Sequence, residues 1–178
     1  LALLCACSGY LGSARDFDPT ELDRDPGWRA VRHIPLIRQE GHADCGAAAL
    51  AMVLAYWGRP LSVPEIASAG GAPGEALTAG ALRDTARRQG LRAYVFSEAG
   101  FEDLEREVTA GRPVIVGLVK PHVTGGLTHY EVVAALHPGQ GLIATLDPAR
   151  GWRQNTYCGF MDEWDPAPAR RLVIVVSP

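Results

Sequence analysis

The sequence lacks both a block of basic residues and an apolar run long enough to cross a bilayer. Its 17 Lys and Arg residues are outnumbered by 20 Asp and Glu residues, so the formal net charge is −3. Nucleic-acid phosphates need clustered positive charge, and we therefore expect no nucleic-acid partner. A membrane-spanning helix needs about 18 consecutive apolar residues, which no segment approaches.

Cysteine is also scarce. The chain has 4 Cys, of which Cys5 and Cys7 lie at its start. Cys45 and Cys158 alone are too few for the disulfide framework of a small secreted domain. A single Cys45–Cys158 disulfide remains an open alternative, and it would predict an inactive protein.

The first residues have the pattern of an export signal. Residues 1–8, Leu-Ala-Leu-Leu-Cys-Ala-Cys-Ser, are predicted to be the end of a truncated bacterial lipoprotein signal. Residues 4–7 resemble a lipobox, which predicts lipid on Cys7 and a protein exported and anchored to the periplasmic or extracellular face of a membrane. An ordinary signal or a cloning remnant is the alternative. Residues 9–33, rich in Gly, Ser, Asp and Pro, are predicted to be a flexible tether.

Residues 34–178 are predicted to form one domain, since 47% of the chain is hydrophobic and 21% is charged. Asp44 is a candidate N-cap for a helix that is apolar on all sides and ends before Gly58. Further helices are expected after Ser62, over 79–89 and around Leu104. Strands are expected at 92–96, 114–119, 129–136, 142–146 and 172–176. The order favours an α+β fold, in which a helical half with a central buried helix packs on a mostly antiparallel sheet.

Cys45 is the candidate nucleophile. A lone Cys in an apolar helix is usually an inert core residue. Cys45, however, is predicted in the first turn of its helix, where free N–H groups favour a thiolate, and polar residues precede it.

A nucleophilic Cys needs a base, and neutral imidazole is suited to that task near pH 7. His129 is the best placed of the histidines because it begins a strand after a Gly-Gly loop. Asp147 ends the next strand, so a hairpin between the two strands would bring both side chains to one end of the sheet. Asp147 could then orient the imidazole. The other candidates are His33, His42, His122 and His137.

Gln39 precedes Cys45 by six residues. An amide donor at this position could stabilise a tetrahedral oxyanion together with the Cys45 N–H. A solvated loop residue is the alternative interpretation of Gln39.

Together these residues resemble the C39 peptidases, papain-like enzymes best known for cutting bacteriocin leaders after Gly-Gly. The resemblance covers about residues 34–176 and rests on Gln-x5-Cys-Gly, His129-Tyr130 and Asp147-Pro148 with Gly151. It implies that Cys45 is the nucleophile, His129 the general base and acid, Asp147 its orienter and Gln39 the oxyanion donor, with no cofactor. Glu131 departs from the family pattern, which commonly has an apolar residue there. The later Phe160 and Trp164 also match the family, and we expect them in the core.

The expected function is a stand-alone, lipid-anchored cysteine peptidase that cuts an exported or surface polypeptide after Gly-Gly or in Gly-rich segments. A catalytically silent module that binds such a peptide is the main alternative. A zinc site using His42 and Cys45, and acyl transfer in place of hydrolysis, also remain open.

Overall fold

The computed structural model describes residues 11–71, 74–121, 128–166 and 168–178. Its strands form one sheet in the order β1-β7-β6-β5-β4-β8-β3, and β2 pairs with β5 outside this path. Every pairing between described strands is antiparallel. The strands are β1 (Arg15–Asp16), β2 (Arg29–Ala30), β3 (Arg92–Phe96), β4 (Val114–Leu118), β5 (His129–His137), β6 (Leu142–Asp147), β7 (Gly151–Thr156) and β8 (Val173–Ser177).

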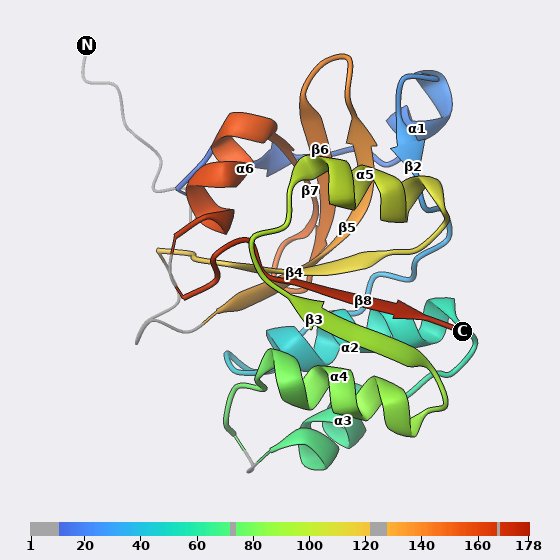
Figure 1. Cartoon of the computed structure of the whole chain (residues 1–178), viewed down its shortest axis with the longest axis vertical. Coiled ribbons are helices and arrows are strands. Elements are labelled where there is room, and N and C mark those ends of the chain that lie inside the picture. Colours follow the sequence, from blue (N-terminus) through green and yellow to red (C-terminus); the bar gives the residue numbers. More distant parts are fainter. Residues whose placement is uncertain (1–10, 72–73, 122–127, 167) are drawn as a thin grey trace.

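Helices cover the sheet in two groups, one on either side of it (Figure 1). One group is α2 (Cys45–Tyr56), α3 (Val63–Gly70) and α4 (Ala79–Arg88), of which α2 packs on β5. The other is α5 (Phe101–Thr109), which contacts β4 and β5, and α6 (Tyr157–Trp164), which contacts β4, β6 and β7. Because both faces of β5 are covered, every residue of that strand is buried.

The expected fold class is confirmed, and the central helix is as buried as its composition predicts. All residues of α2 from Cys45 to Leu54 are buried. The expected capping box is present at α3, where Ser62 Oγ accepts from Glu65 N and the Glu65 carboxylate accepts from Ser62 N. Phe160 and Trp164 lie in the core and pack their rings against Phe101. Strand β7 and helix α6 were not among the expected elements.

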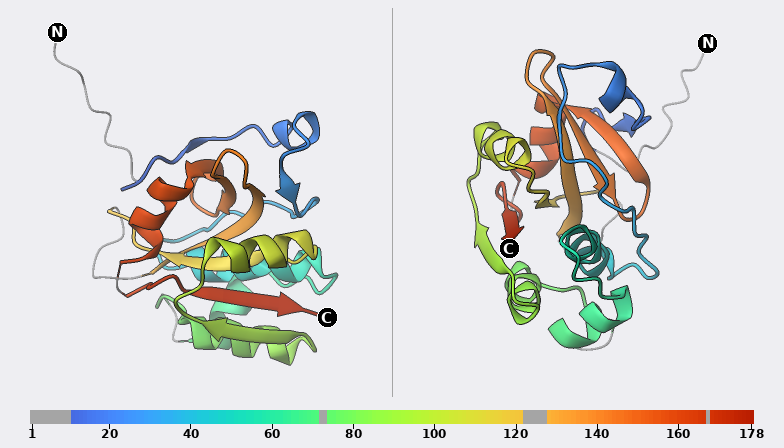
Figure 2. Two further views of the ribbon diagram at one scale, coloured as in Figure 1. Left: turned by 45° about the horizontal axis from the view of Figure 1, so that its top comes forward. Right: turned by 90° about the vertical axis from the view of Figure 1, so that its right-hand side faces the viewer.

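The prediction of a flexible tether is wrong for the described residues 11–33. This segment contains β1, helix α1 (Glu21–Arg24) and β2, and its strands pair with β7 and β5. The segment lies at the end of the molecule opposite α3 (Figure 2). Phe17, Leu22 and Trp28 are buried there against Ala135 and Ala144 of the sheet. These three side chains anchor the segment by apolar burial, which a count of its Gly, Ser, Asp and Pro residues overlooks.

Residues 1–8, and with them Cys7 and the expected lipid anchor, lie outside the described residues. Among the residues that are described, no helix combines the length and the apolar character that crossing a bilayer requires.

Candidate active site

Cys45 is the first residue of α2, as the sequence predicts. The helix begins with the hydrogen bond from Ala48 N to Asp44 O, 2.8 Å long. Asp44 occupies the N-cap position, but its side chain does not cap the helix; Oδ2 instead accepts from Gly41 N at 2.8 Å. This carboxylate therefore closes the turn before the helix, and the first N–H groups of α2 are left without that side-chain acceptor.

His129 and Asp147 meet at one end of the sheet. His129 begins β5, Asp147 ends β6, and the antiparallel pairing of these strands places them together. His129 Nε2 lies 3.0 Å from Asp147 Oδ1, with both side chains buried. The same Oδ1 accepts from Ala149 N at 2.7 Å, which holds the carboxylate in its orientation.

Cys45 approaches the same histidine from α2. Its Sγ lies 3.9 Å from Thr128 O, the carbonyl next to His129, and the thiol is close enough to the His129 imidazole to raise the pKa of that ring. Because Nε2 faces Asp147, the ring nitrogen that remains for the thiol is Nδ1. The imidazole thus stands between the thiol and the carboxylate.

The environment of His129 favours its protonated form. Burial acts to lower the pKa of the imidazole, but the hydrogen bonds with Asp147 and Cys45 and the charges of Asp147 and Glu131 outweigh it. Their combined effect raises the pKa of His129 from 6.5 to about 10. A proton that leaves the thiol can therefore rest on this ring at neutral pH.

Gln39 lies on the loop that leads to α2. Its backbone N–H donates to Pro148 O at 3.2 Å, which joins the loop to the turn after Asp147. Its Nε2 donates to Gly41 O at 2.9 Å. An amide NH2 has two N–H groups, so this contact leaves one for another acceptor.

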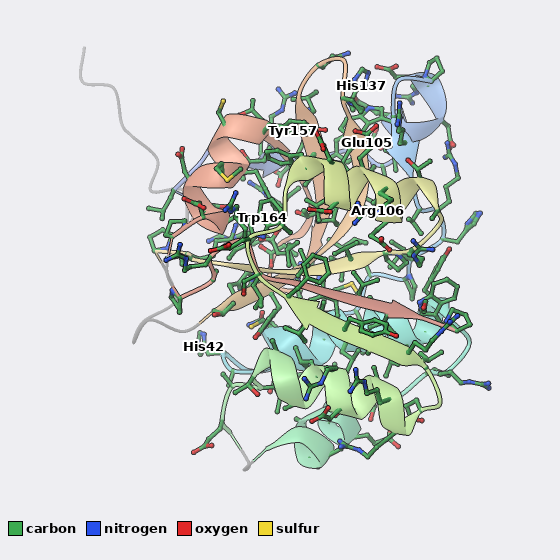
Figure 3. All side chains as sticks on the ribbon, viewed as in Figure 1. His42, Glu105, Arg106, His137, Tyr157 and Trp164 are labelled. Carbon is green, nitrogen blue, oxygen red and sulfur yellow. The ribbon has the colours of Figure 1, made fainter. Side chains whose placement is uncertain are left out.

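The other candidate histidines lie elsewhere. His33 and His42 are exposed, and His42 is on the outer side of the N-terminal end of α2 (Figure 3). His137 ends β5 on the side near α1, where its Nε2 lies 3.2 Å from Asp25 Oδ2 (Figure 3). His122 is outside the described residues.

Two alternatives from the sequence find no support here. Cys45 and Cys158 are free thiols, the first buried and the second exposed, so the structure contradicts the alternative of a disulfide between them. In the described part of the chain, the one group with metal-ligand spacing is His129, Glu131 and Asp147, which includes neither His42 nor Cys45. The Lys120 ammonium lies 2.9 Å from Glu131 Oε1 and already supplies positive charge beside this group.

Glu131 and Lys120 are parts of the site whose roles the sequence did not suggest. Glu131 follows His129 by two residues on β5, and Lys120 follows the end of β4 by two residues. A signal in the sequence could have identified Glu131. It is a charged residue in an otherwise apolar strand, two positions after the candidate base and therefore on the same face of the strand.

Comparison with known proteins identifies the family of the chain. The Peptidase C39 family profile matches residues 33–169. The lactococcin-G-processing and transport ATP-binding protein LagD of Lactococcus lactis subsp. lactis is 26% identical over 129 residues, which are 72% of this chain. The chain spans only 17% of the length of that relative.

Solved structures show the same fold. The peptidase domain of Streptococcus ComA, a bifunctional ABC transporter, superposes with a TM-score of 0.68 at 23% identity, covering 82% of this chain and 99% of that domain. A double-glycine-motif protease from an AMS/PCAT transporter, solved with a leader peptide, gives 0.66 at 22% identity, with 84% and 95% covered. A C39-like peptidase from Bacillus anthracis gives 0.67 at 18% identity, with 84% and 96% covered. Because the family profile matches most of the chain and the fold is shared, the chain belongs to the peptidase C39 family.

Proposed function

We propose that this protein is a cysteine peptidase whose catalytic residues are Cys45, His129, Asp147 and Gln39. The observation that carries the proposal is the buried 3.0 Å contact between His129 and Asp147, beside a thiol at the start of α2. Thiol, imidazole and carboxylate in this order are the parts of a nucleophile, a base and an orienting group.

The arrangement supports acyl transfer in two steps. His129 takes the Cys45 proton, and Sγ attacks the carbonyl carbon of the scissile peptide. The Cys45 N–H and the Gln39 amide donate to the oxyanion of the tetrahedral intermediate. His129 then gives its proton to the leaving amine as the C–N bond breaks, which leaves a thioester on Cys45. Water, deprotonated by His129, attacks this thioester and releases the carboxyl product and the thiol.

The proposed substrate is an exported or surface polypeptide cut after Gly-Gly or within a Gly-rich segment. Its support is the likeness to a double-glycine-motif protease that was solved with a leader peptide. A peptide library that varies the residues on either side of Gly-Gly defines the sequence preference around the cleavage site.

Turnover tests the proposal. Purified protein is incubated with peptides containing an internal Gly-Gly, and the products are identified by mass spectrometry. We expect cleavage by the wild type and by Cys158→Ser, and a loss of at least about 10³-fold in Cys45→Ala. Binding of the peptides by the wild type and by Cys45→Ala, with cleavage by neither, would replace the peptidase by a peptide-binding module.

Export and lipid anchoring through Cys7 also remain a proposal, supported by the lipobox-like residues 4–7 alone. Expression of the full-length gene in bacteria fed an alkyne-bearing fatty acid tests it. We expect label on the wild type and none on Cys7→Ser. Equal labelling of both proteins, or of neither, would reject the anchor.

A further inference from the structure

A chain of buried charges leads from the His129–Asp147 pair to α6. Glu131 Oε1 lies 3.9 Å from His129 Nε2 and 2.9 Å from Lys120 Nζ. The same Nζ donates to Glu163 Oε2 at 2.6 Å. Lys120, Glu131 and Glu163 each have 2% or less of the side chain exposed. One ammonium group is thus shared by two buried carboxylates.

Both carboxylates are also held at their second oxygen. Glu131 Oε2 accepts from Thr145 Oγ1 at 2.6 Å. Glu163 Oε1 accepts from the backbone of the N-terminal segment, from Leu11 N at 2.7 Å and from Gly12 N at 3.4 Å. The charges therefore stand in a fixed arrangement that extends from β6 to the segment leading into β1.

The residue in the middle of this arrangement is unusual for the chain. Lys120 is its only lysine, and the other 16 of its 17 basic residues are arginines. A lysine ammonium is a compact point charge that can lie between two carboxylates, whereas a guanidinium is planar and presents its donors as a rigid fork. Three groups face His129, namely Cys45 of α2, Glu131 of β5 and Asp147 of β6. Lys120 after β4 and Glu163 of α6 act on His129 through Glu131.

We propose that Lys120 is a positioning residue for His129: its ammonium group holds and neutralises Glu131, so that the imidazole stays on Asp147 and keeps its other nitrogen toward Cys45. The inference rests on the proposed peptidase function, because it concerns the same histidine. Without Lys120, Glu131 Oε1 would be a buried anionic oxygen 3.9 Å from the imidazolium. It would then compete with Asp147 for the Nε2 proton, and a ring turned toward Glu131 would withdraw Nδ1 from the thiol.

Four variants test this role: Lys120→Met, Glu131→Gln, the double variant Lys120→Met/Glu131→Gln, and Arg59→Met as an exposed control that also removes a positive charge. The first measurement is an NMR titration of His129 in histidine-labelled protein without substrate. The second is kcat and KM of peptide cleavage across the pH range.

The two single variants should shift His129 in opposite directions. Lys120→Met should raise its pKa, because it leaves Glu131 unneutralised, and Glu131→Gln should lower it by about one pH unit. Lys120→Met should reduce kcat about 10–100-fold with little change in KM, and the double variant should recover most of that loss. Arg59→Met should match the wild type in both measurements.

Several results would overturn the role of Lys120. These are an unchanged His129 titration in both single variants, shifts in the same direction, or a double variant whose losses simply add. If Lys120→Met does not fold, Glu131→Gln decides, because it keeps the shape of Glu131 and the Lys120–Glu163 pair. If the two single variants shift the His129 pKa in opposite directions but the protein cleaves no peptide, the positioning role is supported and the peptidase function is rejected. If the protein cleaves peptides but neither variant shifts the His129 pKa, the peptidase function is supported and the positioning role is rejected.

Discussion

Gly46, the residue after the candidate nucleophile, packs against the ring of Tyr130, the residue after the candidate base. A Cβ placed on Gly46 would lie 3.1 Å from Tyr130 Cδ2 and 3.3 Å from Leu82 Cδ1. Such contacts are tighter than ordinary van der Waals packing. The missing side chain lets α2 approach β5 closely, and this approach brings Cys45 to His129.

Enlarging Gly46 should separate the two elements. Gly46→Val should destabilise the protein by about 1–3 kcal/mol and reduce cleavage, because the added methyl groups push α2 away from β5. Urea unfolding and peptide turnover measure the two effects. Gly80→Val is the matched control, since a Cβ on Gly80 meets nothing closer than Thr78 Oγ1 at 3.8 Å. Equal effects of the two substitutions would contradict the close approach.

Removing the charge of Asp147 should slow catalysis and shift the pH dependence of catalysis. In Asp147→Asn, His129 loses an anionic acceptor, so its pKa falls and the alkaline limb of kcat/KM moves to lower pH. We expect kcat to fall by about 10²–10⁴-fold. Asp162→Asn, at an exposed position of α6, should have no effect. An alkaline limb that stays in place in Asp147→Asn would show that this carboxylate does not act on His129.

His129 should make the stability depend on pH. Its pKa is about 10 in the folded protein, against 6.5 for an ordinary histidine. Because the folded value is the higher one, its stabilising contribution is complete below about pH 6.5 and is lost as the pH rises toward 10. The difference in unfolding free energy between the wild type and His129→Gln should therefore shrink over this range, by on the order of a few kcal/mol. Urea titrations at pH 6, 8 and 10 measure it, and a constant difference would count against the raised pKa.

The two described cysteines should differ in reactivity. At pH 6 ordinary thiols are largely protonated and react slowly. Cys45 can pass its proton to His129, so a limiting amount of iodoacetamide should alkylate it at least about 10-fold faster than the exposed Cys158. Peptide mapping of the wild type, Cys45→Ala and Cys158→Ser measures the rates. Preferential labelling of Cys158 would contradict the transfer of the Cys45 proton to His129.

The N-terminal segment should contribute to stability. Trp28 packs edge-on to His137 and stacks at a tilt with Phe17. Trp28→Ala should cost about 3 kcal/mol of unfolding free energy, because it empties a buried aromatic site. Leu36→Ala, at an exposed position, should cost well under 1 kcal/mol. Urea unfolding that leaves Trp28→Ala as stable as the wild type would mean that the segment is a loose tether after all.

The central helix and several main strands could be predicted from local patterns, because those patterns reflect burial of the residues themselves. A run that is apolar on every side must lie inside, and α2 does. The short strand β7 could not be predicted in this way, since Arg153, Gln154 and Asn155 give it no apolar alternation. Its pairing partners β1 and β6 stabilise it, and one of them lies more than a hundred residues away in the sequence.

The sequence by itself determined the chemistry of the site: a thiol at a helix start, an imidazole at a strand start and a carboxylate at a strand end. Local hydrogen bonding and burial set the ends of these helices and strands, so the ends can be predicted from short segments of sequence. Only the tertiary structure decided how the three groups meet and that the Lys120–Glu131–Glu163 arrangement lies next to them. Contacts of this kind join residues distant in the chain, and their energy depends on a dry interior that exists only once the sheet and both helical layers have packed.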